Sequence, residues 1–354
     1  MNSGPRTPEI VVYSHQPIGS LSMMTEDSLS QALDLFRADF QRLKSELARV
    51  IVGQTQILDD LLVALIAGGH VLLEGVPGLG KTLTVRTLAD ALQLKFQRIQ
   101  FTPDLMPADL IGTQVLGESE QGGRVFEFQQ GPLFTNILLA DEINRATPKT
   151  QSALLEAMQE HSVSVAGTTH KLAQPFFVLA TQNPLEMEGT YPLPEAQLDR
   201  FFVKLLVRYP EVEELEEILN RTTGQDLPHA EFVLDGDRIR EMTALARGIP
   251  IADAIRRQAV ELIVATHPEK EISTTTQKYV RYGASPRGLQ ALILGAKVRA
   301  VLDHRLHVST EDLFAMALPV LRHRLILNFE AQAEGITADA VVTGILSDLG
   351  RLSD

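Results

Sequence analysis

The amino-acid sequence predicts an α/β protein in which helices cover both faces of a parallel sheet, followed by a smaller helical domain. Up to residue 209, short apolar runs typical of buried strands alternate with segments of helical apolar spacing. From residue 210 onward the spacing is mainly helical. Strands that alternate with helices favour a parallel sheet, because each connecting helix lies on a face of the sheet. We therefore expect a flexible leader at 1–26, an α/β domain at 27–209 and a helical domain at 210–354.

The expected elements follow from the apolar spacing and from turn residues. Strands are expected at 70–74, 95–101, 136–140, 176–180 and 201–207. Helices of the first domain are expected at 30–50, 58–66, 83–92, 150–159 and 195–199, with a short one starting near 107. Two hairpins are expected, at about 114–130 and 162–172. Later helices are expected at 211–220, 237–247, 251–266, 287–302, 310–318 and 337–349.

Composition excludes several kinds of chemistry. The chain has 354 residues, 44% of them hydrophobic, which is enough for about two domains with sizeable cores. It contains no cysteine, which excludes disulfides, thiolate catalysis and cysteine-ligated metals. The net charge of -13 argues against broad nucleic-acid binding, which needs a basic face. Without a long apolar run or a secretory signal pattern, the sequence predicts a cytoplasmic protein with no membrane span.

A glycine-rich loop connects the first strand to the helix that follows it. It consists of Gly75, Val76, Pro77, Gly78, Leu79, Gly80, Lys81 and Thr82. Glycine allows backbone conformations in which N–H groups surround an anion, and the first N–H groups of the next helix add to them. We therefore expect the loop to bind the phosphates of ATP or ADP. Lys81 would contact the β and γ phosphates, and the Thr82 hydroxyl would bind Mg²⁺.

An acidic pair, Asp141 and Glu142, ends the strand expected at 136–140. A strand end holds a carboxylate rigidly, so Asp141 is expected to bind Mg²⁺ together with Thr82. Glu142 is expected to orient or deprotonate the attacking water. The alternative is a solvated strand end without a function, but the glycine-rich loop favours catalysis.

Three further polar residues are candidates for contacts with phosphate. Asn183 follows the strand expected at 176–180 and is expected to contact the γ-phosphate or the water; alternatively, it starts the turn before a proline. Arg200 is expected to stabilise phosphoryl transfer in a neighbouring molecule; alternatively, it forms an ion pair with Asp199 or Glu195. Arg287 begins a helix of the second domain and is expected to reach back to the nucleotide; alternatively, it only belongs to a proline-fixed turn.

Together these segments resemble the MoxR family of AAA+ ATPases. The resemblance rests on residues 75–82, 139–146, 180–184, 195–201 and 283–287, in the order typical of the family, and it covers roughly residues 30–350. It implies a P-loop NTPase (AAA+) core with an α-helical lid. The hairpin at 114–130 resembles the helix-2 insert of this clade, and the hairpin at 162–172 resembles its pre-sensor-1 hairpin.

The resemblance also implies roles for individual residues. The loop at 75–82 is similar to Walker A, and Asp141 with Glu142 to Walker B. Asn183 resembles sensor 1, Arg200 the arginine finger and Arg287 sensor 2. The implied catalytic residues are Lys81, Glu142, Asn183, Arg200 and Arg287. The implied nucleotide-binding residues are Val52, Gly53, Gly75, Val76, Pro77, Gly78, Leu79, Gly80, Lys81, Thr82, Leu83, Asp141 and Arg287.

Two finer expectations come from the same resemblance. Adenine is expected near residues 51–54 and Tyr209, and Gln100 is expected to restrain Glu142 until a client binds. Gly288 stands where many relatives have alanine, a departure that leaves Arg287 in place.

For function, the resemblance implies an Mg²⁺-dependent ATPase that forms a homo-oligomeric ring, expected to be a hexamer. Such proteins remodel, assemble or activate protein complexes or insert metal cofactors, often with a partner that carries a von Willebrand factor A domain. One alternative is the ATPase subunit of a metal chelatase, which has the same layout. Another is an ATP-regulated binding module, which the presence of Glu142 and Arg200 disfavours.

A DNA translocase is a third alternative. It should carry lysines and arginines at the tips of its hairpins. The first hairpin instead has Glu118, Glu120 and Glu127 against the single Arg124, so no nucleic-acid partner is expected.

Overall fold

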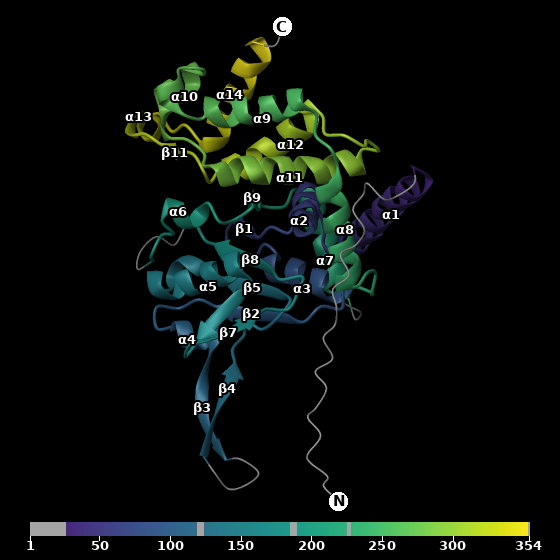
Figure 1. The fold of residues 1–354 in the computed structure, drawn as a ribbon, viewed down its shortest axis with the longest axis vertical. Coiled ribbons are helices and arrows are strands. Elements are labelled where there is room, and N and C mark those ends of the chain that lie inside the picture. Colours follow the sequence, from purple (N-terminus) through teal and green to yellow (C-terminus); the bar gives the residue numbers. More distant parts are fainter. Residues whose placement is uncertain (1–25, 119–123, 185–189, 225–227, 353–354) are drawn as a thin grey trace, which may run out of the picture.

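The computed structural model describes residues 26–118, 124–184, 190–224 and 228–352, so nearly all of the predicted leader lies outside the described residues. The central element is a five-stranded sheet with strand order β2-β5-β8-β1-β9 (Figure 1). All its neighbouring strands pair in parallel. Its strands are β1 (Val71–Glu74), β2 (Phe96–Gln100), β5 (Ile137–Asp141), β8 (Phe177–Gln182) and β9 (Val203–Leu206). The predicted parallel α/β core is therefore confirmed.

Both faces of this sheet are buried, because successive residues of a strand point to opposite sides. In β5, Ile137 and Leu139 enter one core, whereas Leu138 and Ala140 enter another. The first core includes α1 (Glu26–Val50), α2 (Thr55–Ala67) and α3 (Lys81–Ala91). The second includes α4 (Pro107–Ile111) and α5 (Pro148–Glu160). Packing on both faces fixes the carboxyl ends of the strands, where the acidic pair lies.

Two antiparallel hairpins extend from this core. The first pairs β3 (Gly112–Glu118) with β4 (Arg124–Gln130) and projects away from the body of the molecule (Figure 1). The second pairs β6 (Ser162–Val165) with β7 (Thr168–Lys171). Phe128 of the first hairpin stacks on His170 of the second, with 4.3 Å between the ring centroids, so the two hairpins are in contact near their bases. Glu120 lies outside the described residues.

The rest of the chain is mainly helical. After the short α6 (Glu195–Leu198), its helices are α7 (Val212–Thr222), α8 (Gly236–Gly248), α9 (Asp253–Ala265), α10 (Thr274–Tyr279), α11 (Pro286–Leu302), α12 (Thr310–Leu321), α13 (Phe329–Ala333) and α14 (Ala338–Leu352). This part of the chain also contains a short antiparallel pair that was not expected from the sequence, β10 (Val280–Tyr282) with β11 (Ile326–Leu327). Within the described ranges, every helix is too short or too polar to cross a bilayer.

The helices after residue 210 pack in two places. Helices α9 to α14 gather at one end of the molecule, whereas α7 and α8 run beside α1 and α2 (Figure 1). Arg221 of α7 donates hydrogen bonds to the carbonyl oxygens of Ala48 and Arg49 at the end of α1, over 3.0 and 2.7 Å. The segment directly after residue 210 is thus held against helices of the first domain. The domain boundary near residue 210 stays a prediction.

Candidate active site

Most of the expected site residues line two pockets of the described structure. The first, called the loop pocket, has a volume of about 420 Å³. It is lined by residues 77–83, by Arg98 and Gln100 of β2, by Asp141 and Glu142 at the end of β5, and by residues 181–183 at the end of β8. These groups meet because the carboxyl ends of parallel strands lie at the same edge of the sheet.

The backbone of the glycine-rich loop is shaped to hold an anion. Gly78 and Gly80 have φ values of 85° and 75°, in the left-handed region that favours glycine, and open space surrounds the position of a Cβ atom at either residue. Gly80 also caps the N-terminus of α3, where no side chain accepts a hydrogen bond from the first turn. The N–H groups of that turn therefore remain available to phosphate oxygens.

Lys81 lies folded over this loop. Its Nζ donates to the carbonyl oxygens of Gly75 and Val76, over 2.6 and 2.9 Å. Burial lowers the pKa of Lys81, and the charges of Asp141 and Glu142 partly oppose that shift. The Lys81 ammonium thus lies in the loop pocket; that it contacts the β and γ phosphates stays a prediction.

The carboxylate of Asp141 is held at both of its oxygen atoms. Thr181 Oγ1 donates to Oδ1 over 2.6 Å and accepts a hydrogen bond from the Glu142 backbone N–H over 2.8 Å. Arg98 donates to Oδ2 through Nη2 at 2.6 Å and through Nε at 3.2 Å. Asp141 and the following backbone are therefore positioned from the two strands that flank β5.

The carboxylate of Glu142 is held from β2 and from its own short 3₁₀ helix. Gln100 Nε2 donates to Glu142 Oε2 over 2.6 Å, and Arg145 Nε lies 3.1 Å from the same oxygen. The contact expected between Gln100 and Glu142 is therefore present. That a client releases this contact stays a prediction.

The remaining expected nucleotide contacts lie around the loop. Asn183 is buried and lines the loop pocket, close to where the γ-phosphate is expected. Gln54 Nε2 donates to the carbonyl oxygen of Leu79 over 3.3 Å, which ties the turn at 51–54 to the loop. Gly53 in that turn has a φ of 65°, and a Cβ atom there would lie 2.1 Å from Glu214 Oε1. Contact of Val52, Gly53 and the exposed Tyr209 with adenine stays a prediction.

The oxygen donors of the loop pocket fit magnesium. The Thr82 hydroxyl and the Asp141 carboxylate both line it, and Mg²⁺ binds oxygen ligands, often one or two from protein together with substrate phosphates. In the described part of the chain, no cluster of three or more His, Asp or Glu side chains forms a separate metal site. The arrangement therefore suits a metal that arrives with a nucleotide.

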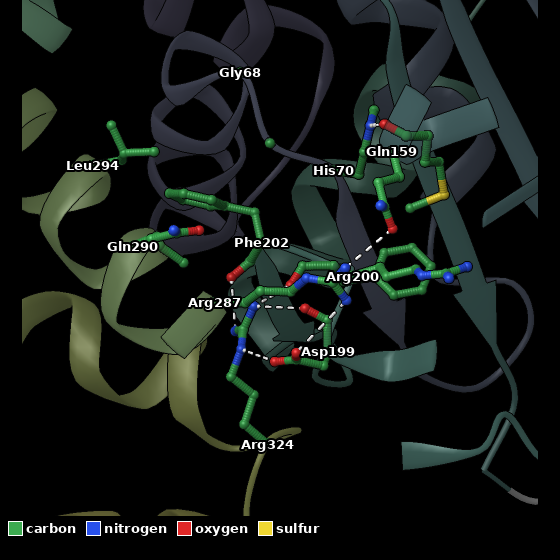
Figure 2. Close-up of a pocket in the computed structure, with 14 residues that line it drawn as sticks. Gly68, His70, Gln159, Asp199, Arg200, Phe202, Arg287, Gln290, Leu294 and Arg324 are labelled. Carbon is green, nitrogen blue, oxygen red and sulfur yellow. Dashed lines mark hydrogen bonds and ion pairs between the residues drawn. The ribbon is translucent and has the colours of Figure 1, made fainter. Parts of the chain in front are cut away.

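The second pocket, called the arginine pocket, lies between the first domain and α11 and has a volume of about 210 Å³. Its polar lining includes Arg200, Arg287, Arg324 and Asp199, and Figure 2 shows Arg287 and Arg324 turned toward Asp199. Arg200 and Arg287, two of the expected catalytic residues, thus lie together here. Within the described chain, neither of them lines the loop pocket.

Asp199 is the acceptor at the centre of the arginine pocket. Arg324 Nε donates to its Oδ1 over 2.9 Å, and Ser285 Oγ donates to its Oδ2 over 2.7 Å. Arg287 Nη1 stands 3.9 Å from Oδ2, and its Nη2 donates to Gln159 Oε1 over 3.1 Å. Asp199 therefore joins the end of α6 to the start of α11.

Arg324 is a buried hydrogen-bond partner of Asp199. Its Nη2 also donates to the carbonyl oxygens of Phe201 and Asp199, over 2.6 and 3.1 Å. Burial is the main cause that lowers its pKa, to about 10, so the guanidinium keeps its charge at neutral pH. Through several hydrogen bonds, this buried and charged arginine holds the segment at 199–202 against the end of α12.

Arg200 takes no part in the hydrogen bonds and ion pairs of Asp199 described above. Within the described residues it forms no ion pair with Asp199 or Glu195, and its Nε atom is buried without a hydrogen-bond partner. The alternative that Arg200 only serves an internal ion pair is therefore not supported.

Comparison with known proteins gives the family. The model of the "ATPase family associated with various cellular activities (AAA)" matches residues 70–203, and the AAA lid domain model matches residues 272–345. Chaperone MoxR1 of Mycobacterium tuberculosis is 44% identical over 302 residues, which cover 85% of this chain and 79% of that protein. Protein MoxR of Methylorubrum extorquens is 33% identical over 319 residues, which cover 85% and 92%. The chain belongs to the MoxR family of AAA+ ATPases.

A solved structure supports the same conclusion for this MoxR-family ATPase. The crystal structure of a predicted ATPase from Cytophaga hutchinsonii matches with a TM-score of 0.83 and 41% sequence identity, covering 91% of this chain and 97% of the other. The predicted family, ATPase activity and AAA+ core with its lid are thereby confirmed.

Three residues of the MoxR-family site were missed by the sequence analysis. Arg98 occupies the strand position two residues before Gln100, and this alternation was an available signal. Thr181 lies near the carboxyl end of the buried strand β8, one residue beyond the strand expected at 176–180. Arg324 has no local signal, because its partner Asp199 lies 125 residues away in the sequence.

Proposed function

We propose that this chain is the Mg²⁺-dependent motor of a homo-oligomeric ring in which each active site is shared by two subunits. The proposal rests on where Arg200 lies and on which groups it contacts. It lies outside the loop pocket of its own chain, its Nε atom finds no hydrogen-bond partner in the part of the chain that the structure describes, and the neighbouring Asp199 is occupied by other donors. An arginine held in this way is suited to the phosphates of an adjacent copy. Arginine fingers accelerate phosphoryl transfer by about 10³–10⁵.

The loop pocket supplies the other groups. Lys81 and the N-terminus of α3 bind the phosphates, while Thr82 and Asp141 hold the metal. Glu142 orients the attacking water and accepts its proton, and Asn183 positions the water or the γ-phosphate. Magnesium, when bound, neutralises part of the phosphate charge.

Arg287 serves the same neighbouring nucleotide as Arg200 in this proposal. Arg287 was expected from the sequence to reach back to the nucleotide, but its guanidinium contacts Gln159 and faces Asp199 in the arginine pocket. Because Arg287 starts α11, nucleotide held by one subunit would be coupled to the lid of the next.

Hydrolysis in the ring drives chaperone-like remodelling, assembly or activation of protein complexes or the insertion of a metal cofactor. Support comes from the MoxR1 relative, which is named a chaperone, and from the first hairpin. Leu116 and Phe126 lie opposite each other on that hairpin and are 53% and 68% exposed. Exposed apolar side chains suit contact with a protein client better than contact with a phosphate backbone.

The remaining features of the proposal rest on the family resemblance. They are a ring of six subunits, location in the cytoplasm and a partner that carries a von Willebrand factor A domain.

Mixing two inactive variants tests the shared site. Arg200→Ala and Lys81→Ala are each expected to abolish most ATP hydrolysis, for different reasons. When the two are mixed, an Arg200→Ala subunit can supply an intact loop to a neighbour that still has Arg200, so activity is expected to return.

The control mixes Lys81→Ala with the double variant Lys81→Ala and Arg200→Ala, which contains no intact loop and should stay inactive. If mixed rings form, as shown by mass measurement, and no mixing ratio restores hydrolysis, the shared site is wrong.

A further inference from the structure

We propose that Arg98 is a positioning residue that holds Asp141 in place of a metal and thereby sets the magnesium concentration needed for nucleotide binding. The inference rests on the proposed function, because it concerns the metal ligand of that same site. Arg98 belongs to none of the sequence motifs from which the site residues were expected.

The geometry of Arg98 is that of a two-point clamp on one carboxylate oxygen. Its Nη2 and Nε atoms lie 2.6 and 3.2 Å from Asp141 Oδ2. Its side chain is 48% exposed, whereas that of Asp141 is only 13% exposed. The arginine therefore covers the carboxylate from the solvent side and remains able to swing away.

The other oxygen of Asp141 is already engaged. Thr181 Oγ1 donates to Oδ1 over 2.6 Å, and the same hydroxyl fixes the backbone of Glu142. A magnesium ion that approaches Oδ2 meets a guanidinium on that atom, and two cations at one oxygen repel each other. Arg98 must therefore leave Oδ2 before the metal can bind there, which makes metal binding less favourable than it would be at a bare carboxylate.

The position of Arg98 on β2 links this step to Glu142. Arg98 and Gln100 project from the same side of the edge strand, and Arg98 Nη2 donates to Gln100 Oε1 over 3.3 Å. Gln100 in turn donates to Glu142 Oε2. One strand thus holds both acidic residues, the metal ligand through Arg98 and the proton acceptor through Gln100.

Magnesium titrations test the role of Arg98 without relying on turnover. A fluorescent ADP analogue is titrated with Mg²⁺ on the full-length protein, starting from a solution that contains EDTA. For Arg98→Gln, the Mg²⁺ concentration that gives half of the binding change is expected to fall about three- to tenfold, as expected for removal of one screened charge. Arg98→Lys keeps the charge but loses the two-point contact, so a smaller decrease is expected.

The matched control is Arg86→Gln, which removes an exposed arginine from α3, the helix that follows the loop. It should leave unchanged the half-point, which is the Mg²⁺ concentration that gives half of the binding change. An unchanged or higher half-point for a folded Arg98→Gln protein would overturn the inference, because a residue that only orients Asp141 would weaken metal binding when removed. If Arg98→Gln does not fold, Arg98→Lys decides by the same criterion. If the wild-type protein binds no nucleotide at any Mg²⁺ concentration, the proposed function fails instead.

Discussion

The loop pocket and the arginine pocket are assembled in opposite ways. The loop pocket is made from one continuous stretch, 77–83, and from the ends of three strands in one sheet. The arginine pocket gathers residues from Gly68 to Arg324, and the bonds that Arg324 donates to residues 199–201 join segments more than a hundred residues apart. The first depends on the local backbone and the second on how the lid is packed.

The two pockets are therefore expected to differ in what they do for the protein. In the proposed function, polar groups of the loop pocket hold phosphate, metal and water, and several of them are partly open to solvent. In the arginine pocket, Arg324 and His70 are buried and bonded, so they maintain the fold that presents Arg200. Substitutions in the loop pocket should therefore change rates, whereas those in the buried part of the arginine pocket should change stability.

The largest effect is expected for Glu142→Gln in the loop pocket. The amide cannot accept the proton of the attacking water, so ATP hydrolysis should fall by about 10²–10⁴. Phosphate release measures the rate, and binding of a fluorescent ADP analogue should stay near the wild-type value. Turnover close to wild type would remove Glu142 from the mechanism.

Arg324→Met tests whether the buried part of the arginine pocket stabilises the fold. It leaves Asp199 without its buried cation, and breaking a buried ion pair costs about 3–5 kcal/mol. Urea unfolding measures the loss. The double variant with Asp199→Asn should recover part of it, because no unpaired charge then remains. A loss below about 1 kcal/mol would show that the arginine pocket tolerates an uncompensated carboxylate.

A pH effect on stability is expected from His70 in the arginine pocket. Its ring is buried, with Nε2 bonded to the Met158 carbonyl oxygen and Nδ1 to the Val178 N–H. Burial lowers the pKa of His70 to about 4, whereas an unfolded histidine has a pKa of about 6.5. Between these values only the unfolded chain binds the proton. The stabilisation that comes from burying a neutral His70 is therefore fully present above about pH 6.5. The free energy of unfolding falls by about 2 kcal/mol by pH 5 as this stabilisation is lost.

Urea unfolding at pH 7 and pH 5 measures this effect. The variant His70→Gln should lose that part of the pH dependence, and the matched change His307→Gln at an exposed position serves as the control. Equal pH dependence in wild type and His70→Gln would show that other groups cause it.

The smallest effect is expected for Gln100→Ala. Removing its hydrogen bond frees the Glu142 carboxylate on one side, while Arg145 remains beside it. Hydrolysis in the absence of any client should rise about two- to twelvefold, since a hydrogen bond of this kind contributes roughly 0.5–1.5 kcal/mol. The unfolding midpoint should hardly change. A slower rate would mean that Gln100 helps to position Glu142 for catalysis.

The loop pocket could be predicted almost completely, because its geometry follows from neighbours in the sequence. Glycine at 78 and 80 allows the left-handed conformations, and the strand before the loop and the helix after it set its direction. Asp141 and Glu142 were placed correctly because parallel strands end at one edge. Arg98 was missed because its salt bridge crosses to a neighbouring strand, and a polar residue on an edge strand is ordinarily solvated.

The sequence by itself determined the α/β core, the glycine-rich loop and the acidic strand end, since each depends on residue type and short-range spacing. Only the tertiary structure decided that Arg98 covers Asp141 and that Arg287 lies beside Arg200. It also decided that Arg324 binds Asp199 and that, among the described residues, the Nε atom of Arg200 has no hydrogen-bond partner. These contacts join residues that are distant in the sequence. Which of several arginines reaches a given carboxylate is therefore determined by how strands, helices and lid pack.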